Sequence, residues 1–92
     1  MVEKMIERKF VDEAKAAGGW APKFTSPGTD GMPDRILLMP GGKIAFVEVK
    51  APGKKPRPLQ LMRHAALRRL GFNVFVLDDP NQIQSIIMEA MA

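Results

Sequence analysis

Three charged residues stand at the ends of two adjacent, mostly apolar segments of the chain. Asp34 begins the segment "DRILLM", whereas Glu48 and Lys50 end the segment "KIAFVEVK". Two carboxylates offer oxygen ligands to a hard divalent cation, which polarises a phosphate and lowers the pKa of an attacking water. A neighbouring ammonium orients that water or stabilises the developing charge. These residue types therefore fit the hydrolysis of a phosphodiester.

A Gly-Gly turn joins the two segments and predicts an antiparallel β-hairpin. Residues two apart on a strand point to the same face, so Glu48 and Lys50 share one face, and the hairpin brings Asp34 beside them. The alternative is an exposed salt bridge between Lys50 and a carboxylate, which contributes little. Pro33 before Asp34, Pro52 after Lys50 and the cationic loop that follows favour a site at the rim of the sheet.

The segments around the hairpin predict the elements that position these residues. Helices are expected over residues 2–17, over residues 59–70 and after Pro80, and a strand apolar enough to be central over residues 72–78. The segment "WAPKF" is predicted as a short edge strand, because proline cannot donate a ladder hydrogen bond. The strand–helix–strand connection after the hairpin favours a parallel crossover, and hence a mixed sheet. The expected apolar helix faces are Val2, Ile6, Phe10, Ala14 and Ala17; Leu59, Met62, Ala66 and Leu70; and Ile83, Ile86, Ile87 and Ala90.

Composition limits the class of protein. The chain has 92 residues, a net charge of +4 and no cysteine, so disulfides and thiolate metal sites are excluded and a reducing, cytoplasmic setting is expected. The length fits one domain, and no apolar run suggests a membrane span or signal peptide. Seven basic residues and no acidic ones lie between Val49 and Leu77. This segment either faces a polyanion or forms a solvated loop and helix.

The residues also resemble a known family. Pro33-Asp34, thirteen intervening residues and Glu48-Val49-Lys50 resemble the PD-(D/E)XK nuclease signature. The fuller set "GMPDR", "FVEVKAP" and "LQ" resembles the VRR-NUC family, particularly its small stand-alone members in phages and bacteria. The resemblance covers nearly the whole chain and implies a single VRR-NUC nuclease domain over residues 1–92. The implied fold is α/β, a restriction-endonuclease-like αβββαβ core with a central mixed sheet flanked by helices.

The resemblance also implies roles for individual residues. Asp34 and Glu48 would be ligands of Mg²⁺ or Mn²⁺, with the Val49 carbonyl as a further ligand. Lys50 would be the catalytic lysine. Gln60 matches the glutamine of the family and would support the site or contact the scissile phosphate.

Four further residues carry predictions of their own. Related Holliday-junction resolvases carry a catalytic glutamate in a stretch resembling "ERKFV", which points to Glu7, although Glu3 lies one turn earlier on nearly the same helix face. His64, the single histidine, is expected at the surface or facing DNA, with a catalytic role as the less favoured alternative. Trp20 is expected in the core or at an interface.

The substrate implied by the resemblance is branched DNA. Phosphate contacts are expected from Lys23, Arg35, Lys54, Lys55, Arg57 and Arg63. Without a recognition-helix motif, structure-selective cutting is the simplest inference, and the two-fold symmetry of a four-way junction suits a homodimer. Candidate dimer contacts are Leu61, Leu67, Met1, Met5, Met88 and Met91. The alternative function is a non-catalytic DNA-binding module on the same fold.

Overall fold

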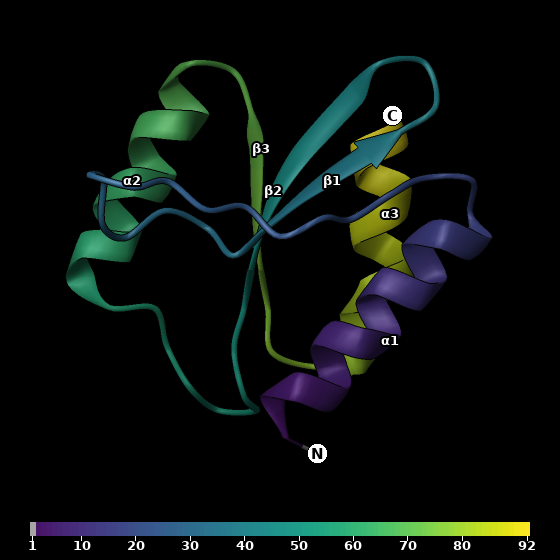
Figure 1. Ribbon diagram of the computed structural model, residues 1–92, viewed down its shortest axis with the longest axis horizontal. Helices are drawn as coiled ribbons and strands as arrows, with labels where there is room; N and C mark the ends of the chain where they lie inside the picture. Colours follow the sequence, from purple (N-terminus) through teal and green to yellow (C-terminus); the bar gives the residue numbers. More distant parts are fainter. Residues whose placement is uncertain (1) are drawn as a thin grey trace.

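Three strands form a mixed sheet (Figure 1). The computed structural model describes residues 2–92. Its elements are α1 (Glu3–Ala16), β1 (Arg35–Met39), β2 (Lys43–Val49), α2 (Pro58–Arg69), β3 (Asn73–Leu77), the 3₁₀ turn η1 (Pro80–Gln82) and α3 (Ile83–Met91). β1 pairs antiparallel with β2, and β3 pairs parallel with β2. The mixed sheet is confirmed, but β3 lies at an edge and not in the centre as predicted, because β2 takes the central place between the other two strands.

The segment predicted as an additional edge strand forms only two isolated bridges. Trp20 pairs with Leu38, and Lys23 pairs with Arg35, on the outer side of β1. Pro22 lies between the two bridges and has no N–H to donate, which is consistent with this interruption. The Trp20 side chain is 66% exposed, so it does not lie in the core, and its alternative place at an interface stays a prediction.

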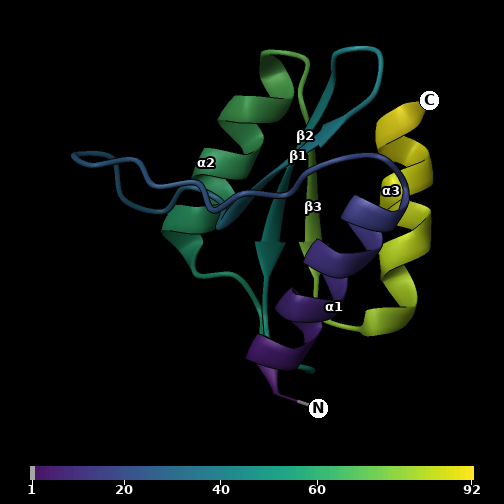
Figure 2. The ribbon, with the colours of Figure 1, turned by 45° about the vertical axis from the view of Figure 1, so that its right-hand side comes forward.

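The helices cover both faces of the sheet. α1 and α3 lie on one face and α2 on the other (Figures 1 and 2). The larger core lies on the α1 and α3 side and contains the predicted residues Ile6, Phe10 and Ala14 of α1 and Ile83, Ile86, Ile87 and Ala90 of α3. Its β2 members Ala45, Val47 and Val49 alternate with Phe46 and Glu48, as expected for a strand covered on both faces.

Helix α2 presents a different face to the sheet from the one predicted. Its buried residues are Gln60, His64 and Leu67, whereas Met62 is 65% and Leu70 74% exposed. Apolar residues occur all around this helix, so their spacing does not fix its rotation. The rotation is set by polar partners of Gln60 and His64 on β2, which are described below.

A long loop leads from the edge segment into β1 and is fixed against α2. Gly31 has a φ of +84°, and a Cβ built there would lie 2.8 Å from the Leu59 Cγ atom, so glycine is required for the close approach. The Arg63 Nε group donates a hydrogen bond of 2.8 Å to the Asp30 carbonyl. Both contacts hold the loop in place immediately before Asp34.

Within residues 2–92, the structure contains no helix with the length and apolar character needed to cross a membrane.

Candidate active site

The hairpin brings Asp34 to the end of β2. In the antiparallel register Arg35 lies opposite Val47, which places Asp34 level with Glu48. The backbone N–H of Val49 donates a hydrogen bond of 2.8 Å to the Asp34 Oδ2 atom. This bond fixes the orientation of the Asp34 carboxylate at the rim of the sheet, as the predicted hairpin requires.

Glu48 is the most deeply buried acidic side chain of the site, with an exposed fraction of 1%. Its Oε2 atom accepts a hydrogen bond of 3.0 Å from the Gln60 Nε2 group and lies 3.9 Å from the Lys50 Nζ atom. Its Oε1 atom lies 3.3 Å from the His64 Nε2 atom. The carboxylate is therefore held through both oxygens, and the ammonium of Lys50 stands beside it.

Because Asp34 and Glu48 lie next to each other, ionising both carboxylates is unfavourable in the metal-free protein. The pKa of Glu48 is raised to about 8, mainly by burial and, to a smaller extent, by a hydrogen bond to Asp34, the Asp34 charge and the Glu3 charge. The ammonium of Lys50 acts in the opposite direction. Two carboxylates that resist joint ionisation in this way define a place where a bound cation relieves their repulsion.

Gln60 connects the start of α2 to Glu48. Its Oε1 atom accepts a hydrogen bond of 2.8 Å from the Arg57 backbone N–H, which satisfies one donor at the helix N-terminus. Its Nε2 group donates to Glu48 in turn. Pro58 at the first helical position also favours a helix start here, because its ring fixes the backbone φ at a helical value.

His64 lies in the interior, so the prediction of a surface or DNA-facing position is wrong. Its side chain is fully buried, one turn after Gln60 on the same helix face. Burial, with a smaller contribution from the Arg68 charge, lowers the pKa of His64, so the ring is neutral at pH 7. When Glu48 is ionised, the ring hydrogen must be on Nε2 to meet Oε1, and Nδ1, which is buried without a partner, is left as an acceptor. The four-residue spacing from Gln60 is the sequence signal for this position.

The two candidate glutamates of α1 have different surroundings. The Glu7 Oε2 atom accepts a hydrogen bond of 2.9 Å from the Arg35 Nε group, and Arg35 also donates to the Ala21 carbonyl. Side chains alternate along β1 and β2, so Arg35 points to the α1 side while Glu48 points to the α2 side. Glu3 lies at the N-terminal end of α1, and its charge acts on Glu48.

The predicted phosphate-contacting residues fall into two groups. Lys54, Lys55 and Arg57 are exposed in the loop between β2 and α2, directly after Lys50, and Lys23 is exposed in the edge segment. In contrast, the guanidinium groups of Arg35 and Arg63 already donate to protein acceptors.

The donor set of the site suits a hard cation. Among residues 2–92, the structure holds no cluster of three or more His, Cys, Asp or Glu side chains that could bind a metal ion. The two apposed carboxylates Asp34 and Glu48 are oxygen donors, as Mg²⁺ and Mn²⁺ prefer. Mg²⁺ commonly uses only one or two carboxylates and completes its coordination with water and substrate phosphate, so this small set fits such an ion.

Comparisons with known proteins identify the family. The model of the VRR-NUC domain family matches residues 4–79. The chain is 55% identical over 76 residues to a protein named "Putative nuclease p44" of Acyrthosiphon pisum secondary endosymbiont phage 1, covering 83% of this chain and 82% of that protein. A solved structure described as a VRR_NUC domain superposes with a TM-score of 0.86 at 34% identity, covering 94% of each chain. The chain therefore belongs to the VRR-NUC family of nuclease domains, and its mixed α/β fold is that of a VRR-NUC structure.

Proposed function

We propose that this protein is a metal-dependent DNA endonuclease that hydrolyses phosphodiester bonds in branched DNA. The observation that supports it most strongly is the buried carboxylate of Glu48, which is apposed to Asp34 and lies 3.9 Å from the Lys50 ammonium. Membership in a nuclease family and the nuclease description of the phage relative agree with this chemistry. That relative also suggests the cytoplasm of a bacterial cell as the place of action.

Each residue of the site has a proposed role. Asp34, Glu48 and the Val49 carbonyl would hold Mg²⁺ or Mn²⁺, which when bound polarises the phosphate and lowers the pKa of an attacking water. The Lys50 ammonium offers positive charge to the phosphoryl oxygens as negative charge accumulates on them. Gln60 keeps Glu48 in position and ties it to the start of α2.

We include His64 among the residues that position Glu48. Replacing it with methionine removes the N–H at Oε1 and is expected to weaken Mn²⁺ binding and cleavage by about 10- to 100-fold, as losses of residues that orient metal ligands do. His64→Gln keeps a donor and is expected to recover most of both. Isothermal titration with Mn²⁺ measures the affinity independently of activity. Leu67→Ala is the matched control, because it removes a buried side chain one turn later on α2. If Leu67→Ala and His64→Met weaken Mn²⁺ binding equally, the role is only structural.

The surroundings of the two α1 glutamates favour Glu3 as the one that acts at the site. Glu3→Gln is expected to weaken Mn²⁺ binding and slow cleavage, because the negative charge of Glu3 acts on Glu48 and its removal makes the site less attractive to a cation. Glu7→Gln is expected mainly to lower the free energy of unfolding by about 1 kcal/mol, because it removes the carboxylate that holds Arg35. Cleavage rates and thermal melting of both variants separate the two effects. The reverse pattern, in which Glu7→Gln is inactive and fully stable, would instead identify Glu7 as the active-site glutamate of α1.

The choice of branched DNA is supported by the basic segment and by the small size of the chain. Lys54, Lys55 and Arg57 are exposed beside the site, and phosphate contacts of this kind supply affinity without sequence choice. The test compares cleavage of a four-way junction, a flap and a linear duplex of matched sequence. Faster cutting of the junction is expected, and equal rates on all three would exclude structure selectivity.

A homodimer would suit the two-fold symmetry of a four-way junction. Leu61 is 51% exposed, and Met5, Met88 and Met91 are also exposed, so they remain candidate contacts. Leu67 is buried against the sheet and is withdrawn from this set, and Met1 lies outside the described residues. Light scattering at micromolar concentration tests the dimer, and a monomer there would contradict it.

A further inference from the structure

A second group of cations lies on the α1 side of the sheet, away from the basic loop that follows Lys50. A shallow pocket of about 260 Å³ is lined by Lys4, Glu7, Arg8, Val11, Lys23 and Arg35. Lys4, Arg8 and Val11 follow one another at helical spacing on α1, Lys23 comes from the edge segment, and Arg35 comes from β1. The pocket is therefore built by three parts of the chain that are distant in sequence.

Glu7 does not neutralise this pocket. Its carboxylate forms an ion pair with Arg35, whose guanidinium also donates a hydrogen bond to the Ala21 carbonyl. Among residues 2–92, the ion pairs within 4.0 Å do not include Lys4, Arg8 or Lys23. Lys4 and Arg8 are four residues apart on the helix, where like charges repel each other. Three exposed cations around one shallow pocket thus make a site that an anion would stabilise.

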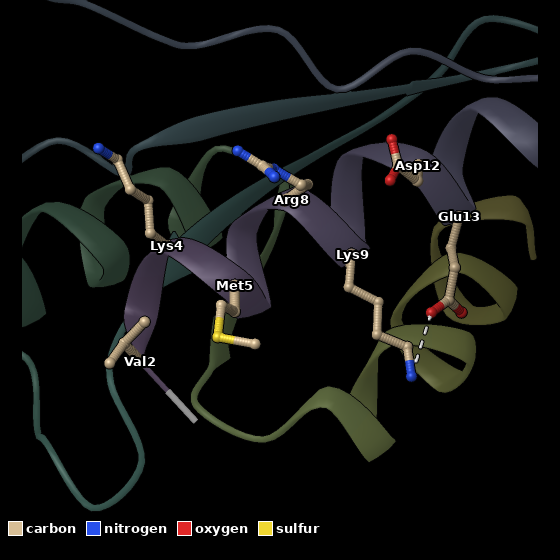
Figure 3. Close-up of a pocket in the computed structure, with 7 residues that line it drawn as sticks. All are labelled: Val2, Lys4, Met5, Arg8, Lys9, Asp12 and Glu13. Atoms are coloured by element: carbon tan, nitrogen blue, oxygen red, sulfur yellow. Dashed lines mark ion pairs between the residues drawn. The ribbon is translucent and has the colours of Figure 1, made fainter.

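The opposite side of α1 is arranged differently. Figure 3 shows the Lys4, Arg8 and Asp12 side chains extending from one side of the helix, with Met5, Lys9 and Glu13 on the other, around a second pocket that they all line. There Lys9 is paired with Glu13 at 3.8 Å, as a charge in an ordinary solvated helix often is. Lys4 and Arg8 thus differ from Lys9, which has an ion-pair partner on its own helix.

The pocket lies at the same end of the sheet as the candidate active site, on the α1 face. Arg35 directly follows Asp34 in the chain, and Lys23 forms a bridge with Arg35 at the edge of β1. The N-terminal end of α1 lies beside the loop that follows β2 in both ribbon views (Figures 1 and 2). Cations thus flank the site on two sides, the basic loop on one and this pocket on the other.

We propose that Lys4, Arg8 and Lys23 bind backbone phosphates of the DNA adjacent to the cleaved bond. The proposal rests on the proposed function only for the identity of the ligand, because it takes DNA as the substrate. Arg35, paired with Glu7, also lines the pocket, and this pair links β1 to α1 there. The pocket extends the DNA-binding surface from the basic loop across the end of the sheet to α1.

The test measures the salt dependence of DNA binding for two triple variants. One removes the pocket cations (Lys4→Gln, Arg8→Gln and Lys23→Gln), and the other removes three exposed lysines elsewhere (Lys9→Gln, Lys15→Gln and Lys43→Gln). Both variants carry three fewer positive charges, so long-range attraction to DNA falls equally. Binding to a duplex without terminal phosphates is followed by fluorescence anisotropy in EDTA, and thermal melting confirms that both variants are folded.

Removing one cation that binds a phosphate lowers the slope of log K against log salt concentration by about one. The slope of the pocket variant is expected to fall by about two to three, and that of the control variant by much less. Equal slopes in the two variants would overturn the proposal, as would a decrease seen only on DNA with a 5′-terminal phosphate. The assay does not depend on cleavage. If the protein does not cleave DNA but shows the expected slopes, the proposed nuclease function is refuted and the proposed phosphate contacts of this pocket are supported.

Discussion

Replacing Lys50 with methionine is expected to slow DNA cleavage by about 10²- to 10³-fold, the usual effect of removing one group that stabilises transition-state charge. Methionine keeps most of the length of the side chain but carries no charge. The Lys50 ammonium lies 3.9 Å from the Glu48 Oε2 atom, at the rim where a phosphate would approach. Single-turnover rates at saturating DNA and Mg²⁺ measure the effect.

The matched control is Lys54→Met, which removes the next cation along the chain. Lys54 is exposed in the loop after β2, so its loss is expected to weaken DNA binding and to leave the rate at saturating DNA nearly unchanged. Lys50 also lowers the pKa of Glu48, so its loss is expected to shift metal binding toward higher pH. A Lys50→Met protein that cuts saturating DNA within a few-fold of the wild-type rate would remove Lys50 from the chemistry.

Glu48→Gln is expected to abolish detectable cleavage, with a loss of about 10³-fold or more, because it removes one of two carboxylates that would hold the metal. The glutamine has the shape of the glutamate and stays next to Gln60 and His64, so the fold is expected to survive. Titration with Mn²⁺ is expected to show no binding at concentrations that saturate the wild type. Wild-type Mn²⁺ affinity in this variant would contradict the assignment of Glu48 as a ligand.

The same substitution is expected to stabilise the metal-free protein at high pH. Because burial and the neighbouring Asp34 together raise the pKa of Glu48 from 4.5 to about 8 in the fold, the folded state holds this proton more tightly than the unfolded chain does. The contribution to stability is complete below pH 4.5 and is lost as the pH rises to about 8. In EDTA, the melting temperature of the wild type should therefore fall relative to Glu48→Gln between about pH 5 and pH 8. Parallel melting curves of the two proteins over this range would contradict the raised pKa.

The hairpin and its charged end follow directly from the sequence. Two mostly apolar segments joined by a Gly-Gly turn predict the antiparallel pairing that the structure shows. Once this pairing is known, Asp34 must lie level with Glu48, and Glu48 and Lys50 must share a face. The parallel placement of β3 follows from the crossover through α2. These features depend on local pattern and chain connectivity, which one sequence contains.

The rotation of α2 could not be predicted in the same way. Apolar side chains occur on several sides of this helix, and the predicted face contained Met62 and Leu70, which are exposed. The buried face instead carries Gln60 and His64, because each meets an oxygen of Glu48. A polar residue is buried when its partner comes from another element, and that partner is known only after the sheet is assembled.

The surroundings of the charged residues on α1 were also beyond the sequence pattern. Glu3 and Glu7 lie on nearly the same helix face, so spacing could not separate them. The structure does so because Arg35 points to the α1 side of the sheet and pairs with Glu7. The edge position of β3 could not be predicted for a related reason. It depends on which strand has a neighbour along both of its edges, and in this sheet that strand is β2.

The central claim is that Asp34 and Glu48 support metal-dependent cleavage of DNA, and the most direct measurement is cleavage of a labelled four-way junction. Wild-type protein would be compared with Asp34→Ala in Mg²⁺, in Mn²⁺ and in EDTA, with junction binding measured in parallel. We expect the wild type to cut the junction with a divalent metal and not in EDTA, and Asp34→Ala to bind the junction without cutting it. Tight binding by the wild type without cleavage in either metal would contradict the claim and assign the chain to a non-catalytic DNA-binding module.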